Sequence, residues 1–171
     1  GNSTVQNNTF TGNYSNNGAG LFISTGSSLI RNNTFTDNQG AGLSIESGSP
    51  TIQGNIFTGN HNGVYNLSGN PLIQENSFTD NGDWGIYNKS GSPNIQGNIL
   101  SANSSDYVGG IYNDSGNPTI QDNEIKGTTG SGVYNESGSP IIQNNLITDS
   151  TGENGHGISN RTGSPLVQGN I

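Results

Sequence analysis

The 21 residues from Gly48 to Ser68, GSPTIQGNIFTGNHNGVYNLS, are one copy of a repeat that runs through the whole chain. Successive copies have lengths of 25, 22, 21, 22, 25, 22 and 25 residues, with 9 residues left over. The copies begin at Gly1, Gly26, Gly48, Gly69, Gly91, Gly116, Gly138 and Gly163. A period of this length is typical of solenoids, in which stacked repeats bury one continuous core.

Three positions of the repeat are apolar in every copy. The first holds Val5, Ile30, Ile52, Ile73, Ile95, Ile120, Ile142 and Val167. The second holds Phe10, Phe35, Phe57, Phe78, Leu100, Ile125 and Ile147, and the third Leu21, Leu43, Val64, Ile86, Ile111, Val133 and Ile158. Short apolar segments separated by Gly, Asn and Pro predict three short strands per copy. Copies stacked about 4.8 Å apart would turn each position into an apolar row.

The composition excludes several classes of protein. Of 171 residues, 29 are Asn, 28 Gly, 22 Ser and 15 Thr, and the net charge is −8. That charge argues against a nucleic-acid-binding surface, and no apolar run approaches the roughly 18 residues of a membrane span. Cysteine is absent, so there is no disulfide framework or Cys-based metal site. No calcium-loop spacing occurs either, so we expect no metal and no cofactor.

The repeat Pro-x-Ile-Gln-x-Asn-x-Phe-Thr-x-Asn, followed by Gly-Ile-Tyr-Asn-x-Ser, resembles the right-handed parallel β-helix repeat of the pectin-lyase-like superfamily. The resemblance covers the whole chain and implies an all-β, single-stranded parallel β-helix of seven turns and a partial eighth. It leaves activity open, because that superfamily includes lyases, hydrolases, adhesins and noncatalytic repeats. Its lyases combine acidic metal ligands with a basic proton abstractor. Here Arg31, Lys89, Lys126 and Arg161 lie in other positions of the repeat than the candidate acids, which favours a noncatalytic type.

Two asparagine positions recur. One predicts a ladder of stacked side-chain amides at a turn: Asn8, Asn33, Asn55, Asn76, Asn98, Asn123, Asn145 and Asn170. The other supplies half of the ten Asn-x-Ser/Thr glycosylation triplets, which begin at Asn2, Asn7, Asn13, Asn32, Asn66, Asn88, Asn103, Asn113, Asn135 and Asn160. Ile23 and Ile45 share that second position, which indicates that it faces inward, whereas Asn13 and Asn103 are candidates on exposed loops.

All variation in repeat length falls before the third apolar position, and such variable edges often carry function. We predict loops here, among them 104–109 and 129–131. Asp83 and Asp106, on adjacent copies, are candidate catalytic carboxylates. The aromatic candidates for sugar binding are Tyr65, Trp84, Tyr87, Tyr107, Tyr112 and Tyr134. The alternative for the tyrosines is stacking on one another as ordinary sheet stabilisers.

These observations predict one repeat domain over residues 1–171 without evident caps, a segment of a longer chain or filament. We expect an extracellular or cell-surface structural solenoid that associates end to end and carries or binds glycans. We expect no nucleic-acid partner and no membrane span. The alternative is a carbohydrate-binding or carbohydrate-active β-helix that uses the variable edge.

Overall fold

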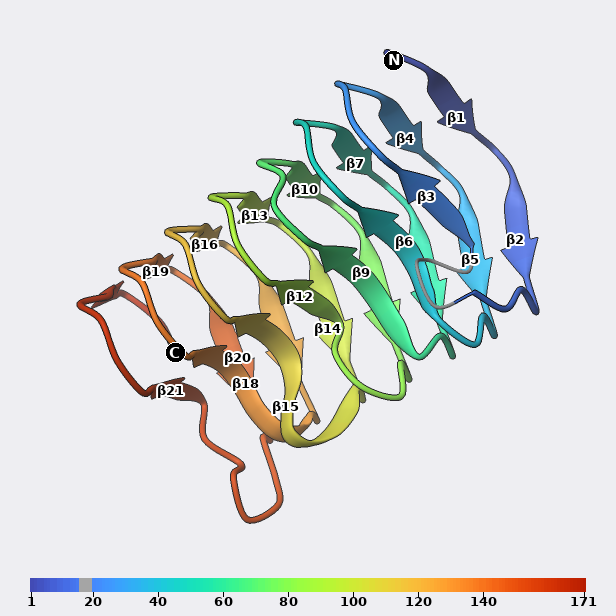
Figure 1. The fold of residues 1–171 in the computed structure, drawn as a ribbon. Coiled ribbons are helices and arrows are strands. Elements are labelled where there is room, and N and C mark those ends of the chain that lie inside the picture. The colour runs from blue at the N-terminus through green and yellow to red at the C-terminus, as the bar shows by residue number, and fades with distance from the viewer. Residues whose placement is uncertain (16–19) are drawn as a thin grey trace.

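The computed structural model describes residues 1–15 and 20–171, and only the backbone at residues 106 and 107. The chain coils into a stack of turns, and the two ends of the chain lie at opposite ends of the stack (Figure 1). Each complete turn contributes three short strands, and every strand pairs in parallel with its equivalents in neighbouring turns. The sequence prediction of an all-β parallel β-helix is confirmed.

The strands form three sheets, one along each side of the coil. Sheet A consists of β1 (Thr4–Gln6), β4 (Leu29–Arg31), β7 (Thr51–Gln53), β10 (Leu72–Gln74), β13 (Asn94–Gln96), β16 (Thr119–Gln121), β19 (Ile141–Gln143) and β22 (Leu166–Gln168). Sheet B consists of β2 (Thr9–Thr11), β5 (Thr34–Thr36), β8 (Ile56–Thr58), β11 (Ser77–Thr79), β14 (Ile99–Ser101), β17 (Glu124–Lys126) and β20 (Leu146–Thr148). Sheet C consists of β3 (Leu21–Ile23), β6 (Ala41–Ile45), β9 (Asn62–Asn66), β12 (Ile86–Asn88), β15 (Ser104–Asn113), β18 (Thr129–Asn135) and β21 (Ile158–Asn160).

The three apolar positions of the repeat form the core, as predicted. Ile73 pairs with Ile52 and Ile95, and Phe78 pairs with Phe57, so equivalent residues lie directly above one another. The phenyl rings of Phe35 and Phe57 stack with centroids 4.7 Å apart and planes 4° from parallel. The rows are continuous along the coil, and this explains how so few apolar residues make one core.

A row of asparagines turns the chain between sheets A and B. In Asn33, Nδ2 donates to Oδ1 of Asn55 (3.1 Å) and to the carbonyl of Val5 (2.9 Å), while its backbone N–H donates to the same Oδ1. The preceding residue has a positive φ, such as 54° at Asn32. The predicted asparagine ladder is therefore present, and it satisfies backbone groups that the turn leaves unpaired.

Two further polar rows lie in the interior. One turns the chain between sheets B and C, where Asn60 Nδ2 donates to Asn81 Oδ1 (3.1 Å) and to the carbonyl of Phe35 (3.0 Å). The other follows sheet C, where Asn88 Nδ2 donates to Asn113 Oδ1 at 2.7 Å. With the first ladder, the interior thus has three rows of hydrogen-bonded amides, of which the first runs the length of the coil and the other two run through part of it.

Candidate functional site

The variable edge of the repeat is sheet C. Every strand of sheets A and B has three residues, whereas strands of sheet C have between three and ten. Residues 104–109 and 129–131, predicted as loops, belong to β15 and β18 instead. They extend these strands because Ser104 and Val108 find partners in Thr129 and Ser131 of the next turn. Variation at this edge therefore reshapes the outer face of one sheet.

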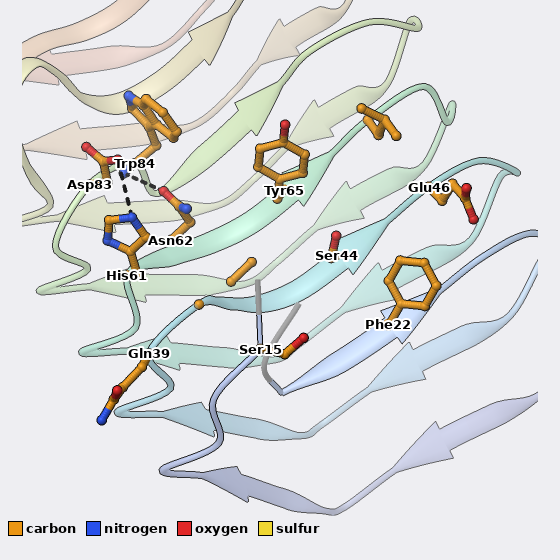
Figure 2. A pocket seen from close by; sticks show the side chains of 13 residues that line it. Ser15, Phe22, Gln39, Ser44, Glu46, His61, Asn62, Tyr65, Asp83 and Trp84 are labelled. Carbon is orange, nitrogen blue, oxygen red and sulfur yellow. Dashed lines mark hydrogen bonds and ion pairs between the residues drawn. The ribbon is translucent and has the colours of Figure 1, made fainter. Parts of the chain in front are cut away.

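An open hollow of about 600 Å³, the first hollow, lies over the N-terminal half of sheet C. Figure 2 shows Tyr65 near its middle, with His61, Asp83 and Trp84 on one side and Glu46 and Phe22 on the other. The outward residues of β3, β6 and β9 form its floor, because side chains alternate across a strand. Its walls come from the residues just before and just after these strands.

Trp84 separates the first hollow from a second. Its ring stacks on Tyr87 with centroids 4.6 Å apart and planes 24° from parallel, and it meets Tyr112 at 5.6 Å. Trp84 lines both hollows. Tyr87, a predicted sugar-binding residue, is only 9% exposed and lines neither hollow, so it supports Trp84 from below.

The second hollow, of about 390 Å³, lies farther along the same face. Tyr112, Tyr134, Glu136 and Arg161 line it together with Asp83 and Trp84, which also line the first hollow. The Tyr134 hydroxyl donates to Glu136 Oε2 (2.9 Å), and Arg161 Nη1 donates to Glu136 Oε1 (2.5 Å). In this hollow a guanidinium of the chain itself, that of Arg161, therefore lies beside a carboxylate and aromatic rings.

The hydroxyls of Tyr87, Tyr112 and Tyr134 stay protonated to higher pH than an ordinary tyrosine, because the pKa of each is raised. Burial, and then the carboxylate of Asp114, raises the pKa of Tyr87 far above its usual value. Burial is also the largest cause that raises the pKa of Tyr112 and of Tyr134, and Glu136 adds to both. Each phenol therefore remains a hydrogen-bond donor, as Tyr87 is to Asp114 at 3.1 Å.

The candidate catalytic carboxylates are not brought together as a described pair. Asp83 is half-buried, and its Oδ2 lies 3.8 Å from Nε2 of His61. The side chains of Asp106 and Tyr107 lie outside the described residues, so their predicted roles stay predictions. Among the residues that the structure describes, no three His, Asp or Glu side chains gather as a metal site would require. The described part of the chain also contains no helix long and apolar enough to cross a membrane.

Five glycosylation candidates are buried with their amides hydrogen-bonded. They are Asn66, Asn88, Asn103, Asn113 and Asn135. Their burial argues against glycans at these positions, and Asn103 does not lie on an exposed loop as predicted. The hydroxyl residue of each sheet C triplet is also engaged: Ser90 Oγ donates to the Leu67 carbonyl at 2.7 Å, and Thr162 Oγ1 donates to the Glu136 carbonyl at 2.7 Å. The candidates that remain exposed are Asn2, Asn7, Asn13, Asn32 and Asn160.

The sequence did not single out the acidic wall of the two hollows. Glu46 and Glu136 each follow the inward position that ends a sheet C strand. They therefore stand at the same edge of the face as the outward tyrosines, two residues after Ser44 and Tyr134. The signal was available in that spacing, because residues two apart in an extended chain point the same way.

Comparison with known families agrees with this architecture. Residues 19–171 match the sequence model of the family described as "Right handed beta helix region". No curated protein and no solved structure matched the chain.

Proposed function

This chain belongs to the right-handed β-helix family, and from that premise we propose that it is a rigid, noncatalytic structural rod that works outside the cell or at the cell surface. The observation that carries the proposal is the set of three internal amide ladders. A stalk has to resist bending and local opening, and rows of buried side-chain hydrogen bonds add to the backbone ladders for that purpose.

Two features support a mechanical role over a catalytic one. The interior rows run from turn to turn, so each turn depends on both neighbours. The acidic candidate Asp83 pairs with His61 at the rim of an open hollow, with no cluster of metal-binding side chains in the described chain. We therefore assign the exterior to solvation and contact.

End-to-end self-association belongs to the same proposal. Neighbouring turns meet through parallel strand edges in three sheets and through the asparagine row between sheets A and B, so one rod can stack on another as its own turns stack. Repeated head-to-tail contacts of this kind produce fibres when they do not close into a ring.

Electron microscopy of the purified protein over a range of concentrations tests this proposal. We expect straight rods whose length increases with concentration. Particles of a single length at every concentration would contradict the proposed self-association. Curved or flexible particles would contradict the proposal that the protein is a rigid rod. Incubation with polysaccharide panels should release no products; turnover that Asp83→Asn abolishes would overturn the noncatalytic assignment.

A second function, carbohydrate binding, is favoured by the aromatic face of sheet C. Trp84 packs against both Tyr87 and Tyr112 and lines both hollows, and rigid aromatic faces beside polar groups suit sugar rings. In a glycan array with titration of the hits, Trp84→Ala should lower affinity roughly tenfold. The control Ile99→Ala changes an exposed residue on sheet B and should bind as the wild type does. Equal binding by both variants would remove this function.

Attached glycans, if the host adds them, are proposed for the exposed triplets alone. The asparagines concerned are Asn2, Asn7, Asn13, Asn32 and Asn160. Mass spectrometry of protein from its native source, before and after enzymatic deglycosylation, tests this. Glycans found at Asn88 or Asn113 would contradict the buried ladder at those positions.

A further inference from the structure

The first hollow is acidic. Glu46 and Asp83 both line it, none of the described residues around it is Lys or Arg, and its one histidine, His61, lies 3.8 Å from Asp83. The chain as a whole carries a net charge of −8, so no distant surplus of positive charge offsets these carboxylates. A ligand with carboxylate groups would be repelled here, whereas a cationic ligand would be attracted.

The second hollow shows what this kind of surface accepts. There the guanidinium of Arg161 donates to Glu136. Burial raises the pKa of Tyr112 and of Tyr134, and the positive charge of Arg161 offsets part of that rise. The chain itself thus places a cation among tyrosine rings and a carboxylate. The first hollow repeats the combination of aromatic rings and carboxylates, but its described lining supplies neither Lys nor Arg.

The two carboxylates of the first hollow lie at opposite sides of it. Figure 2 shows Asp83 and Glu46 at the two margins with Tyr65 between them. Glu46 directly follows β6 and Asp83 precedes β12, on the turns either side of β9, so their separation exceeds the length of β9, about 13 Å from position 62 to position 66. That separation is too long for one ammonium group to meet both acids, and it suits a ligand with at least two.

We propose that the first hollow binds an oligosaccharide whose sugars carry free amino groups. One ring lies against Tyr65 and Trp84, and the ammonium groups of the chain reach Asp83 at one margin and Glu46 at the other. Aromatic faces add to this attraction because they favour cations as well as sugar rings. Ser44, Asn62 and Gln39 offer hydroxyl and amide groups to the sugar hydroxyls.

This inference rests on the carbohydrate-binding function proposed above and names its ligand class. A lysine-rich peptide carries the same ammonium groups, but the breadth of the hollow and its hydroxyl and amide lining favour a sugar. We therefore treat the peptide as a competing outcome of the test.

The decisive experiment is calorimetric titration of the intact chain with four probes. These are the tetramer of β-1,4-linked glucosamine, the fully N-acetylated tetramer, a neutral glucose tetramer and tetralysine. We expect the glucosamine tetramer to bind at least tenfold more tightly than the other three. Its affinity should fall when salt is raised to about 0.5 M, because salt screens charges at an open site.

Two variants locate the ammonium sites. Asp83→Asn and Glu46→Gln should each weaken binding of the glucosamine tetramer roughly three- to fivefold, since pairs of exposed charges contribute modestly. The matched controls are Asp122→Asn and Glu75→Gln, which remove exposed carboxylates that do not line either hollow. Both controls should bind as the wild type does. Thermal melting of all four variants verifies that they are folded.

The outcomes separate the two claims. Equal binding of the glucosamine and N-acetylated tetramers would overturn the amino-sugar inference and leave carbohydrate binding intact. Binding of tetralysine alone would overturn both in favour of a basic peptide partner. No binding of any probe would overturn the inference, and carbohydrate binding would then stand or fall on the glycan array.

Discussion

Sheets A and B differ from sheet C in how constant their strand lengths are. Strands of sheets A and B never depart from three residues, while β15 has ten and β18 has seven. The asparagine row between sheets A and B is unbroken from Asn8 to Asn170. The row between sheets B and C gives way after Asn103 to Thr128 and Ser150, whose hydroxyls lie 3.3 Å apart.

This difference shows where the fold tolerates change. A corner held by an uninterrupted amide row cannot gain a residue without losing several buried hydrogen bonds. The entry to sheet C faces solvent, so inserted residues extend a strand or project from it. The hollows lie on the outer face of sheet C, the sheet whose strands vary in length.

The largest expected loss of stability comes from truncating a residue of the inner phenylalanine row of sheet B. Phe57 is fully buried between Phe35 and Phe78, and Phe57→Ala should lower the free energy of unfolding by about 3–5 kcal/mol. The adjacent Ile56 points outward and is 48% exposed, so Ile56→Ala should cost less than about 1 kcal/mol. Urea denaturation measures both. Similar losses would mean that sheet B is not oriented as described.

Interrupting an amide row should cause the second-largest loss in the free energy of unfolding. Asn76→Ala removes the acceptor for the backbone and side chain of Asn55 and the donor to the Ile52 carbonyl. We expect a loss of about 2–4 kcal/mol, because several buried polar groups lose their partners. Gln74→Ala, on the outer surface of the same turn, serves as control and should change stability by less than about 1 kcal/mol. Chemical denaturation of both variants provides the measurement.

Within sheet C, the inner side should prove rigid and the loop tolerant. A Cβ at Gly63 would lie 2.4 Å from the Gly85 carbonyl oxygen and 2.6 Å from a ring carbon of Phe78. Gly63→Ala should therefore destabilise by about 1–3 kcal/mol. At Gly82 the nearest atom is 3.8 Å away, so Gly82→Ala should leave the melting temperature unchanged or raise it slightly. A loss at Gly82 as large as that at Gly63 would contradict this division.

The smallest expected effect is a change in the pH dependence of stability, which comes from Tyr87 on sheet C. The raised pKa of Tyr87 means that the folded chain keeps its phenol protonated after the unfolded chain, with a pKa of about 10, has begun to lose the proton. This contribution to stability is complete below pH 10 and is lost as pH rises towards the folded pKa, at up to about 1.4 kcal/mol per pH unit. Tyr87→Phe should flatten the fall in melting temperature between pH 10 and 11. An unchanged slope would mean that the hydroxyl of Tyr87 does not titrate differently on folding.

The fold could be predicted from the sequence because the core positions repeat at a nearly constant spacing. The positions of Ile52, Phe57 and Val64 are apolar in each complete copy, and the observed strand pairing follows that register. The amide row through Asn55 was equally visible, since an asparagine at a fixed position has one simple explanation in a stacked turn. Identical neighbours make each turn's environment known in advance.

The site was only partly predictable, because it depends on contacts that break the period. Trp84 occurs once in the chain, and nothing in the repeat shows that it would stack on Tyr87 and cover it. The ion pair of Arg161 with Glu136 joins adjacent turns across 25 residues of sequence. The triplets misled for a related reason. An inner asparagine followed by a serine that bonds to the previous turn produces the glycosylation triplet for structural reasons alone, as at Asn88 and Ser90.

The amide rows also give the molecule a direction. In all three rows each Nδ2 donates to the Oδ1 that follows it in sequence, as from Asn33 to Asn55, from Asn60 to Asn81 and from Asn88 to Asn113. The side-chain dipoles therefore add along the axis, as peptide dipoles do in an α-helix. One end of any such stack presents oxygens and the other presents N–H groups. Two copies can join donor end to acceptor end, but two like ends would face each other with unmatched polarity, so an assembled fibre would be a polar filament with distinguishable ends.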